Sequence, residues 1–156
     1  MKKVFTIIAV LIFSKMSTAQ NIQGSSDTAA IKQTMNTFFD AMRKGDSTLL
    51  RSVFSKGSIL QSISNDKNGV AKLSTKTADD LVKQIGTPHS QVFDERIVYN
   101  GIKIDGSLAC VWTPYKFYLG DQFSHCGVNA FELMRTADGW KVVYIVYTVR
   151  NNDCIQ

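Results

Sequence analysis

The fold of this chain is decided by residues 107–150, which read SLACVWTPYKFYLGDQFSHCGVNAFELMRTADGWKVVYIVYTVR. β-Branched and aromatic residues, which favour strands, are dense throughout this segment. Two pairs of turn residues, Gly120-Asp121 and Asp138-Gly139, interrupt it. The pattern predicts antiparallel strands over residues 107–119, 123–135 and 140–150, with one more strand over about 93–99 before them.

The half of the chain before this segment has the pattern of helices. Its first apolar face is formed by residues at spacings of three and four: Ile31, Met35, Phe38, Phe39 and Met42. Asp27 is expected to cap this helix, and Gly45 to end it. Thr77 and Asp80 predict the capping box of a later helix. Helices followed by a strand meander predict an α+β fold, in which the N-terminal helices pack on one face of a curved antiparallel sheet.

The first 19 residues have the pattern of a signal peptide. Lys2 and Lys3 precede an apolar run over residues 4–13, and cleavage is expected after Ala19. The apolar run is too short to cross a bilayer core of about 30 Å, so no membrane span is expected. We therefore predict an exported chain, periplasmic or secreted, in which residues 20–156 form a single domain.

The basic character of the chain comes largely from this leader. Of the 18 Lys and Arg residues, Lys2, Lys3 and Lys15 lie within it, so cleavage leaves 15 basic residues against 13 acidic ones. The formal charge falls from +5 to +2. No run of basic residues remains, and we expect no binding to nucleic acid.

Three segments carry a family resemblance: CVWTPYKFY at 110–118, FSHCGVN at 123–129 and GWKV at 139–142. They resemble bacterial nuclear transport factor 2-like proteins, in particular an exported subset called SnoaL-like or putative lumazine-binding. The resemblance implies a cystatin-like cone whose helices close over the sheet and leave a pocket, often within a homodimer. It implies function only weakly, since this fold serves isomerases, cyclases, dehydratases and binding proteins.

The turns allow an estimate of which strand residues share a face. Two-residue turns at Gly120-Asp121 and Asp138-Gly139 would pair Leu119 with Gln122 and Ala137 with Trp140. One face then mixes large apolar and polar groups, as in a small-molecule pocket, and provides five candidate ligand-binding residues: Trp112, Tyr118, Asn129, Tyr144 and Thr148. The other face is uniformly apolar and is expected to form a dimer contact through Val128, Ala130, Val143, Ile145 and Tyr147. A single bulge would exchange these assignments.

His125 lies on the mixed face and is the candidate catalytic residue. The pKa of an unperturbed histidine, about 6.5, suits a general acid or base, although a structural histidine is the alternative interpretation. The ketosteroid-isomerase branch of the fold needs a carboxylate base and a tyrosine donor. The corresponding stretches here, Ile59–Ser62 and Phe38-Phe39, contain neither. Since the chain has only two histidines and no C-x-x-C, no metal site is expected, and no motif indicates a cofactor.

Three cysteines, Cys110, Cys126 and Cys154, permit at most one internal disulfide. The estimated register places Cys126 opposite residue 151, close to Cys154, whereas Cys110 is about five residue pairs away. We predict a disulfide between Cys126 and Cys154 that leaves Cys110 as a buried thiol. Three reduced cysteines are the alternative, because the compartment favours oxidation without fixing it.

Three functions fit these observations. The first is an exported pocket protein that binds a small, partly aromatic molecule, since the mixed face as estimated has no acid–base pair. The second is a SnoaL-like enzyme of the isomerase, cyclase or dehydratase type that uses His125 for proton transfer. The third is a dimeric interaction module whose cone is filled by its own side chains.

Overall fold

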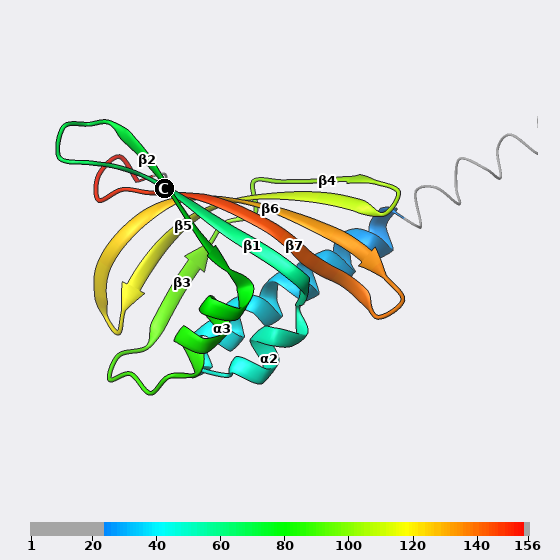
Figure 1. The fold of residues 1–156 in the computed structure, drawn as a ribbon. Helices are drawn as coiled ribbons and strands as arrows, with labels where there is room; N and C mark the ends of the chain where they lie inside the picture. Colours follow the sequence, from blue (N-terminus) through cyan, green and yellow to red (C-terminus); the bar gives the residue numbers. More distant parts are fainter. Residues whose placement is uncertain (1–23, 155–156) are drawn as a thin grey trace, which may run out of the picture.

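The computed structural model describes residues 24–154 and shows a curved sheet with helices packed against its concave side (Figure 1). The predicted signal peptide, residues 1–19, lies outside the described residues. Within residues 24–154, no helix is long and apolar enough to cross a membrane. The predicted α+β arrangement, with N-terminal helices on one face of a curved sheet, is confirmed.

Three helices precede or interrupt the strands: a long N-terminal helix over residues 24–44, α2 (Ser47–Ser52) and α3 (Ala78–Gly86). Asp46 caps α2, since its side chain accepts a hydrogen bond of 2.8 Å from the backbone N–H of Leu49. Thr77 and Asp80 form the predicted capping box of α3. The prediction that Asp27 caps the long helix is wrong. Asp27 lies inside that helix, where it is buried and pairs with Arg135.

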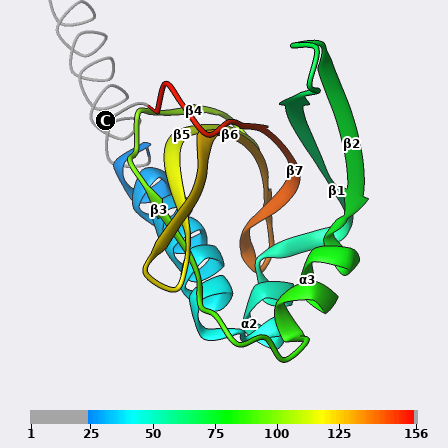
Figure 2. The ribbon, with the colours of Figure 1, turned by 90° about the vertical axis from the view of Figure 1, so that its left-hand side faces the viewer.

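The sheet has seven strands: β1 (Phe54–Asn65), β2 (Ala71–Thr77), β3 (Phe93–Ile97), β4 (Gly101–Asp105), β5 (Leu108–Leu119), β6 (Gln122–Thr136) and β7 (Gly139–Val149). Their order is β2-β1-β7-β6-β5-β3, and β4 pairs with the first half of β5. All pairs are antiparallel except β1 with β7. The order makes β2 and β3 the two edges of the sheet: β3 lies beside the long helix, and β2 runs down into α3 (Figure 2).

The estimated register is wrong along most of the sheet. Leu119 does pair with Gln122, but an irregularity between Phe117 and Tyr118 shifts every earlier pair of β5 and β6 by one residue. The turn before β7 is one residue earlier than estimated, so Trp140 pairs with Arg135, and a second irregularity follows Glu132. A one-residue slip moves a side chain to the opposite face. The residues of β5 up to Phe117 that were estimated to share a face with the odd-numbered residues of β6 therefore lie on the opposite face.

The core lies between the helices and the concave face. Four phenylalanine rings meet there edge to face, with centroids 5.0 to 6.0 Å apart: Phe38 and Phe39 from the long helix, Phe54 from β1 and Phe131 from β6. Such edge-to-face packing orients rings more specifically than area burial alone. Phe131 is among the most buried side chains, and its partners anchor the long helix to the centre of the sheet.

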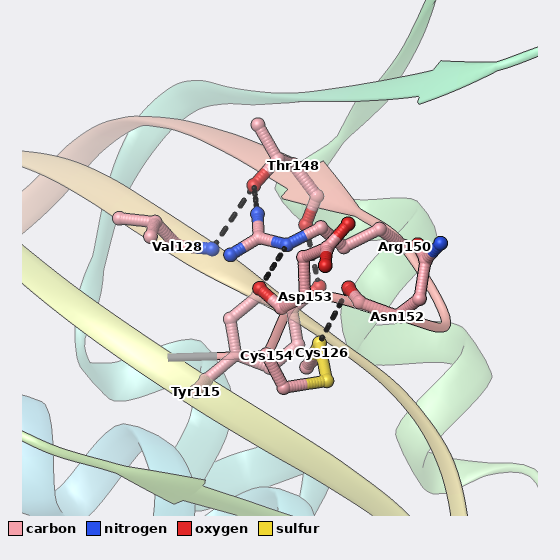
Figure 3. Close-up of a disulfide and its surroundings, with 8 residues drawn as sticks. All are labelled: Tyr115, Cys126, Val128, Thr148, Arg150, Asn152, Asp153 and Cys154. Carbon is pink, nitrogen blue, oxygen red and sulfur yellow. Dashed lines mark hydrogen bonds between the residues drawn. A yellow bond between two sulfur atoms is a disulfide. The ribbon is translucent and has the colours of Figure 1, made fainter. Parts of the chain in front are cut away.

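A disulfide between Cys126 and Cys154 ties the C-terminal segment to β6, with the two Cα atoms 5.7 Å apart (Figure 3). Cys126 exchanges two backbone hydrogen bonds with Arg150, not with residue 151 as the estimated register implied. The chain then turns back at Asp153, whose carbonyl accepts a bond of 3.1 Å from Arg150 Nε. Cys110 is free, and it is partly exposed rather than buried, with its thiol donating to Glu132 at 2.8 Å.

Candidate functional site

A cavity of about 290 Å³ lies between the concave face of the sheet and the helices. Aromatic rings supply much of its wall: Phe38, Tyr115, Phe117, Phe131 and Tyr147. A smaller set of polar side chains converges on the same space: Lys76, Gln84, Glu95, His125 and Asn129. Apolar walls with a few convergent polar groups are typical of sites for small molecules.

Glu95 is the central charged group of the cavity. It lies on edge strand β3 opposite Phe117 of β5, so both side chains face inward. Burial raises the pKa of Glu95 to about 7, although the hydrogen bond from Asn129 and the charge of Lys76 act in the opposite direction. The carboxyl group therefore changes charge near neutral pH, which is unusual for a glutamate.

Asn129 fixes the position of this carboxyl group. Its side chain is only 4% exposed, and Nδ2 donates to Glu95 Oε1 at 2.7 Å. The same Nδ2 lies 3.5 Å from the hydroxyl of Thr113, the cross-strand neighbour on β5. A buried amide needs such partners, since an unsatisfied polar group in a core is costly. Asn129 on β6 thus connects β5, through Thr113, with the edge strand β3, through Glu95.

Lys76 lies on the opposite edge of the sheet. It pairs with Leu60, which also lines the cavity, and it is the one residue of β2 that is not fully exposed. Burial lowers the pKa of Lys76, while the charges of Asp80 and Glu95 partly offset this effect. The cavity therefore has a cationic edge on β2 and an acidic edge on β3.

His125 and Tyr115 complete the polar wall. The His125 ring stacks on Phe117 with centroids 4.8 Å apart, and burial lowers the pKa of His125. The Tyr115 hydroxyl donates to the backbone carbonyl of Thr148 at 2.7 Å, and its pKa is raised by burial and by the nearby charge of Glu95. Tyr115 thus remains a protonated donor, whereas His125 is largely neutral at pH 7.

Of the six candidate site residues, the structure brings two into the cavity, His125 and Asn129. The other four lie on the outer face because of the shift in register: Trp112, Tyr118, Tyr144 and Thr148. Trp112 is 51% exposed there, and Tyr144 is bound to Gln61 through its hydroxyl. Tyr118 lies under the Arg96 guanidinium, 4.1 Å from the ring centroid. The dimer face is also divided, since Ile145 and Tyr147 face the cavity.

The sequence interpretation missed Glu95 and Lys76. The alternation Phe93, Glu95, Ile97 was a usable signal for Glu95, because it places an acid on the same strand face as two apolar residues. Lys76 gave no such signal, since no strand was predicted over β2. Among the described residues, no group of His, Cys, Asp and Glu is arranged to hold a metal.

Comparison with protein families matches residues 26–148 to the family described as putative lumazine-binding. The match covers most of the chain and ends one residue before the end of β7. No curated protein matches the chain.

Solved structures show the same fold at low sequence identity. A nuclear transport factor 2-like protein with a cystatin-like fold from Novosphingobium aromaticivorans has a TM-score of 0.70 and 11% identity, over 88% of this chain and 91% of that one. A nuclear transport factor 2-like protein of unknown function from Shewanella baltica has a TM-score of 0.63 and 20% identity, over 82% of this chain and 97% of that one. A "putative dehydratase" of Streptomyces avermitilis has a TM-score of 0.61 and 13% identity, over 81% of this chain and 97% of that one. With the family match, these likenesses lead to one conclusion: the chain belongs to the putative lumazine-binding family, which has the nuclear transport factor 2-like fold.

Proposed function

We propose that this protein is exported and binds a small, partly aromatic molecule in the cavity between the helices and the sheet. The observation that carries the proposal is the enclosed Glu95–Asn129 pair, set among aromatic walls in a cavity of about 290 Å³. Burying a carboxyl group costs free energy of folding unless the group is hydrogen-bonded or paired, and a bound ligand would supply a partner. The family's description as lumazine-binding also supports a small-molecule ligand. Export is supported by the leader pattern of residues 1–19.

The test is to purify the protein from the exported fraction and identify, by mass spectrometry, what is bound to it. We expect one aromatic compound at a stoichiometric amount. Phe117→Ala, which removes a cavity wall, is expected to lower the bound fraction at least about tenfold, since a buried aromatic wall contributes strongly to binding. Trp112→Ala on the outer face is the matched control and should bind normally. Empty protein, or equal loss in both variants, would contradict the proposal.

A second candidate is an enzyme that moves a proton within the same cavity. It is favoured by the presence of His125 and Glu95 on one wall, with the pKa of Glu95 near neutrality. A structural relative described as a putative dehydratase agrees with this class. The compound identified above separates the two candidates. Conversion of that compound by the wild type, with loss of turnover in His125→Ala, would establish the enzyme.

We also propose a homodimer, formed through the outer face of the sheet and not through the divided face predicted from sequence. Leu108 and Met134 are cross-strand neighbours on that face, 48% and 40% exposed, and Trp112, 51% exposed, lies on the same face four residues further along β5. Adjacent exposed apolar residues of this size are typical of an interface. Light scattering at micromolar concentration is expected to give twice the chain mass, and Trp112→Glu to give the monomer. A monomeric wild type would rule out this contact.

The third hypothesis, a dimeric module with a filled cone, has less support. The space between the helices and the sheet retains about 290 Å³ and is lined in part by charged groups. A cone filled by its own side chains would be expected to pack at the density of an ordinary core.

A further inference from the structure

The two charged groups of the cavity come from opposite edges of the sheet. Lys76 is on β2 and Glu95 is on β3, the first and last strands of the order β2-β1-β7-β6-β5-β3. Lys76 lies at the end of β2 that runs into α3 (Figure 2). Both side chains line the same cavity. The cavity therefore has a cationic group from one edge of the sheet and an acidic group from the other.

These two groups influence each other without forming an ion pair. The charge of Lys76 lowers the pKa of Glu95, and the charge of Glu95 raises the pKa of Lys76. Yet among the ion pairs of residues 24–154, all within 4.0 Å, none joins them or involves Lys76 at all. Asp80, the other acid near Lys76, is engaged in the Thr77 capping box. The ammonium group of Lys76 is therefore free to bind an anion from the cavity.

Glu95 likewise has bonding capacity that faces the cavity. A carboxylate can accept about four hydrogen bonds. Oε1 accepts one bond from Asn129, whereas no donor in the described part of the chain is bonded to Oε2. That oxygen is available to an O–H or N–H group of a ligand. A charge-assisted bond of this kind is stronger than a neutral one, particularly away from bulk water.

The space between the two edges is walled by rings, among them Phe38, Phe117 and Phe131. We propose that the cavity selects a small aromatic acid: its acid group lies at Lys76, its ring lies between the aromatic walls, and an O–H or N–H donor at its far end binds Glu95. This inference rests on the proposed binding function and specifies its ligand class. The reverse orientation would place like charges together at Glu95.

The test uses a matched set of fluorescent probes that differ only in their end groups. 6-Hydroxy-2-naphthoate carries both groups, 2-naphthoate carries only the acid, and 2-naphthol carries only the donor. Their benzene analogues, 4-hydroxybenzoate, benzoate and phenol, cover a shorter span. At pH 8, the compound with both groups is expected to bind at least about tenfold more tightly than either partner in its series, since each charge-assisted contact contributes about that much.

Two variants assign the ends. Lys76→Met is expected to weaken both acids at least about tenfold and to change 2-naphthol less than about threefold. Glu95→Gln is expected to weaken the hydroxy acid at least about tenfold, while 2-naphthoate binds as well as before or better because a negative charge is removed. Lys72→Met, on the same strand but exposed and outside the cavity, is the control and should bind like the wild type.

The pH dependence gives a separate measure of Glu95. Since its pKa is about 7, the affinity for the hydroxy acid should rise by up to about tenfold from pH 6 to pH 8 as the carboxylate forms. His125, also in the cavity, would act in the opposite direction when protonated, whereas Tyr115 and Tyr147, whose pKa values are raised, keep their protons over this range. Burial lowers the pKa of Lys76, and any change in its charge acts on both acids alike. 2-Naphthoate has no donor for Glu95 and reports the charge effects that both acids share, so the ratio of the two affinities isolates the bond to Glu95.

Glu95→Gln is expected to fold. Ionising a glutamate whose folded pKa is raised from about 4.5 to about 7 destabilises the native state, so stability present below pH 4.5 is lost as the pH rises to 7. The variant escapes this loss and should be at least as stable as the wild type at pH 8.

The outcomes separate the two levels of proposal. If the three naphthalenes bind with equal affinity, or Lys76→Met weakens all three alike, the assignment of the two ends is wrong and the binding function stands. If no probe of either length binds at millimolar concentration, the proposed ligand class is wrong. If, in addition, the exported protein carries no compound, the binding function itself fails.

Discussion

Replacing Gly127 by alanine is expected to lower the free energy of unfolding by about 3 kcal/mol or more. Overpacking a well-packed site usually costs about 1–3 kcal/mol, and more where the backbone has to move. An added Cβ at Gly127 would stand 1.9 Å from the carbonyl oxygen of Thr148 and 2.8 Å from Cε1 of Tyr115. Neither distance is possible without a shift of the neighbouring strand.

The reason is that a tyrosine side chain crosses strand β6 at this glycine. Tyr115 on β5 pairs with Gly127, and its hydroxyl donates to Thr148 on β7, one strand further on, at 2.7 Å. The ring of Tyr115 can reach over β6 because Gly127 has no side chain. An alanine would displace either the ring or the β7 carbonyl, so it would break the hydrogen bond that joins β5 to β7 across β6.

Gly101→Ala is the matched control, since an added Cβ there meets nothing within 4 Å and the backbone has no positive φ. Urea unfolding followed by circular dichroism should show Gly101→Ala within about 1 kcal/mol of the wild type. If Gly127→Ala unfolds at the same urea concentration as this control, the contact between Tyr115 and Thr148 does not constrain the sheet as described.

The order of elements and the helix signals could be predicted from sequence because they are local. The capping box of Thr77 and Asp80 and the apolar face at Met35 and Phe38 depend on neighbours within a few residues. The strand faces could not, because each irregularity moves all later side chains by one position. A single shift next to Phe117 decided whether Trp112 or Thr113 faces the core, and no local pattern marks it.

The candidate site was only half predictable for a related reason. Asn129 was identified correctly as a polar group on the inward face of β6, because the alternation along that strand puts it on the same face as Phe131 and Leu133. Glu95 and Lys76 meet across the curved sheet from its two edges, and their proximity exists only in the tertiary fold. A sequence with no strand predicted at β2 gives no reason to place residues 76 and 95 in one cavity.

Removing the disulfide is the second large effect. The double variant Cys126→Ala/Cys154→Ala is expected to lose about 3–4 kcal/mol of stability, the loop-entropy estimate for a sequence separation of 28. Part of the loss would come from the native state, since the bridge holds residues 151–154 over the end of β6 (Figure 3). Release of this segment would free the Asp153 carbonyl from Arg150 and expose position 126, where the native cysteine is only 1% exposed.

The measurement compares urea midpoints with and without a reductant in three proteins. On reduction, the urea midpoint of the wild type should fall to that of the double variant, whereas the midpoint of the double variant should not change. Cys110→Ala, which removes only the free thiol, should respond to the reductant as the wild type does. The loop model predicts this loss because the bridge restricts the unfolded chain. A wild type whose midpoint is unchanged by complete reduction would therefore show that β6 and the C-terminal segment are held by their backbone and side-chain hydrogen bonds alone.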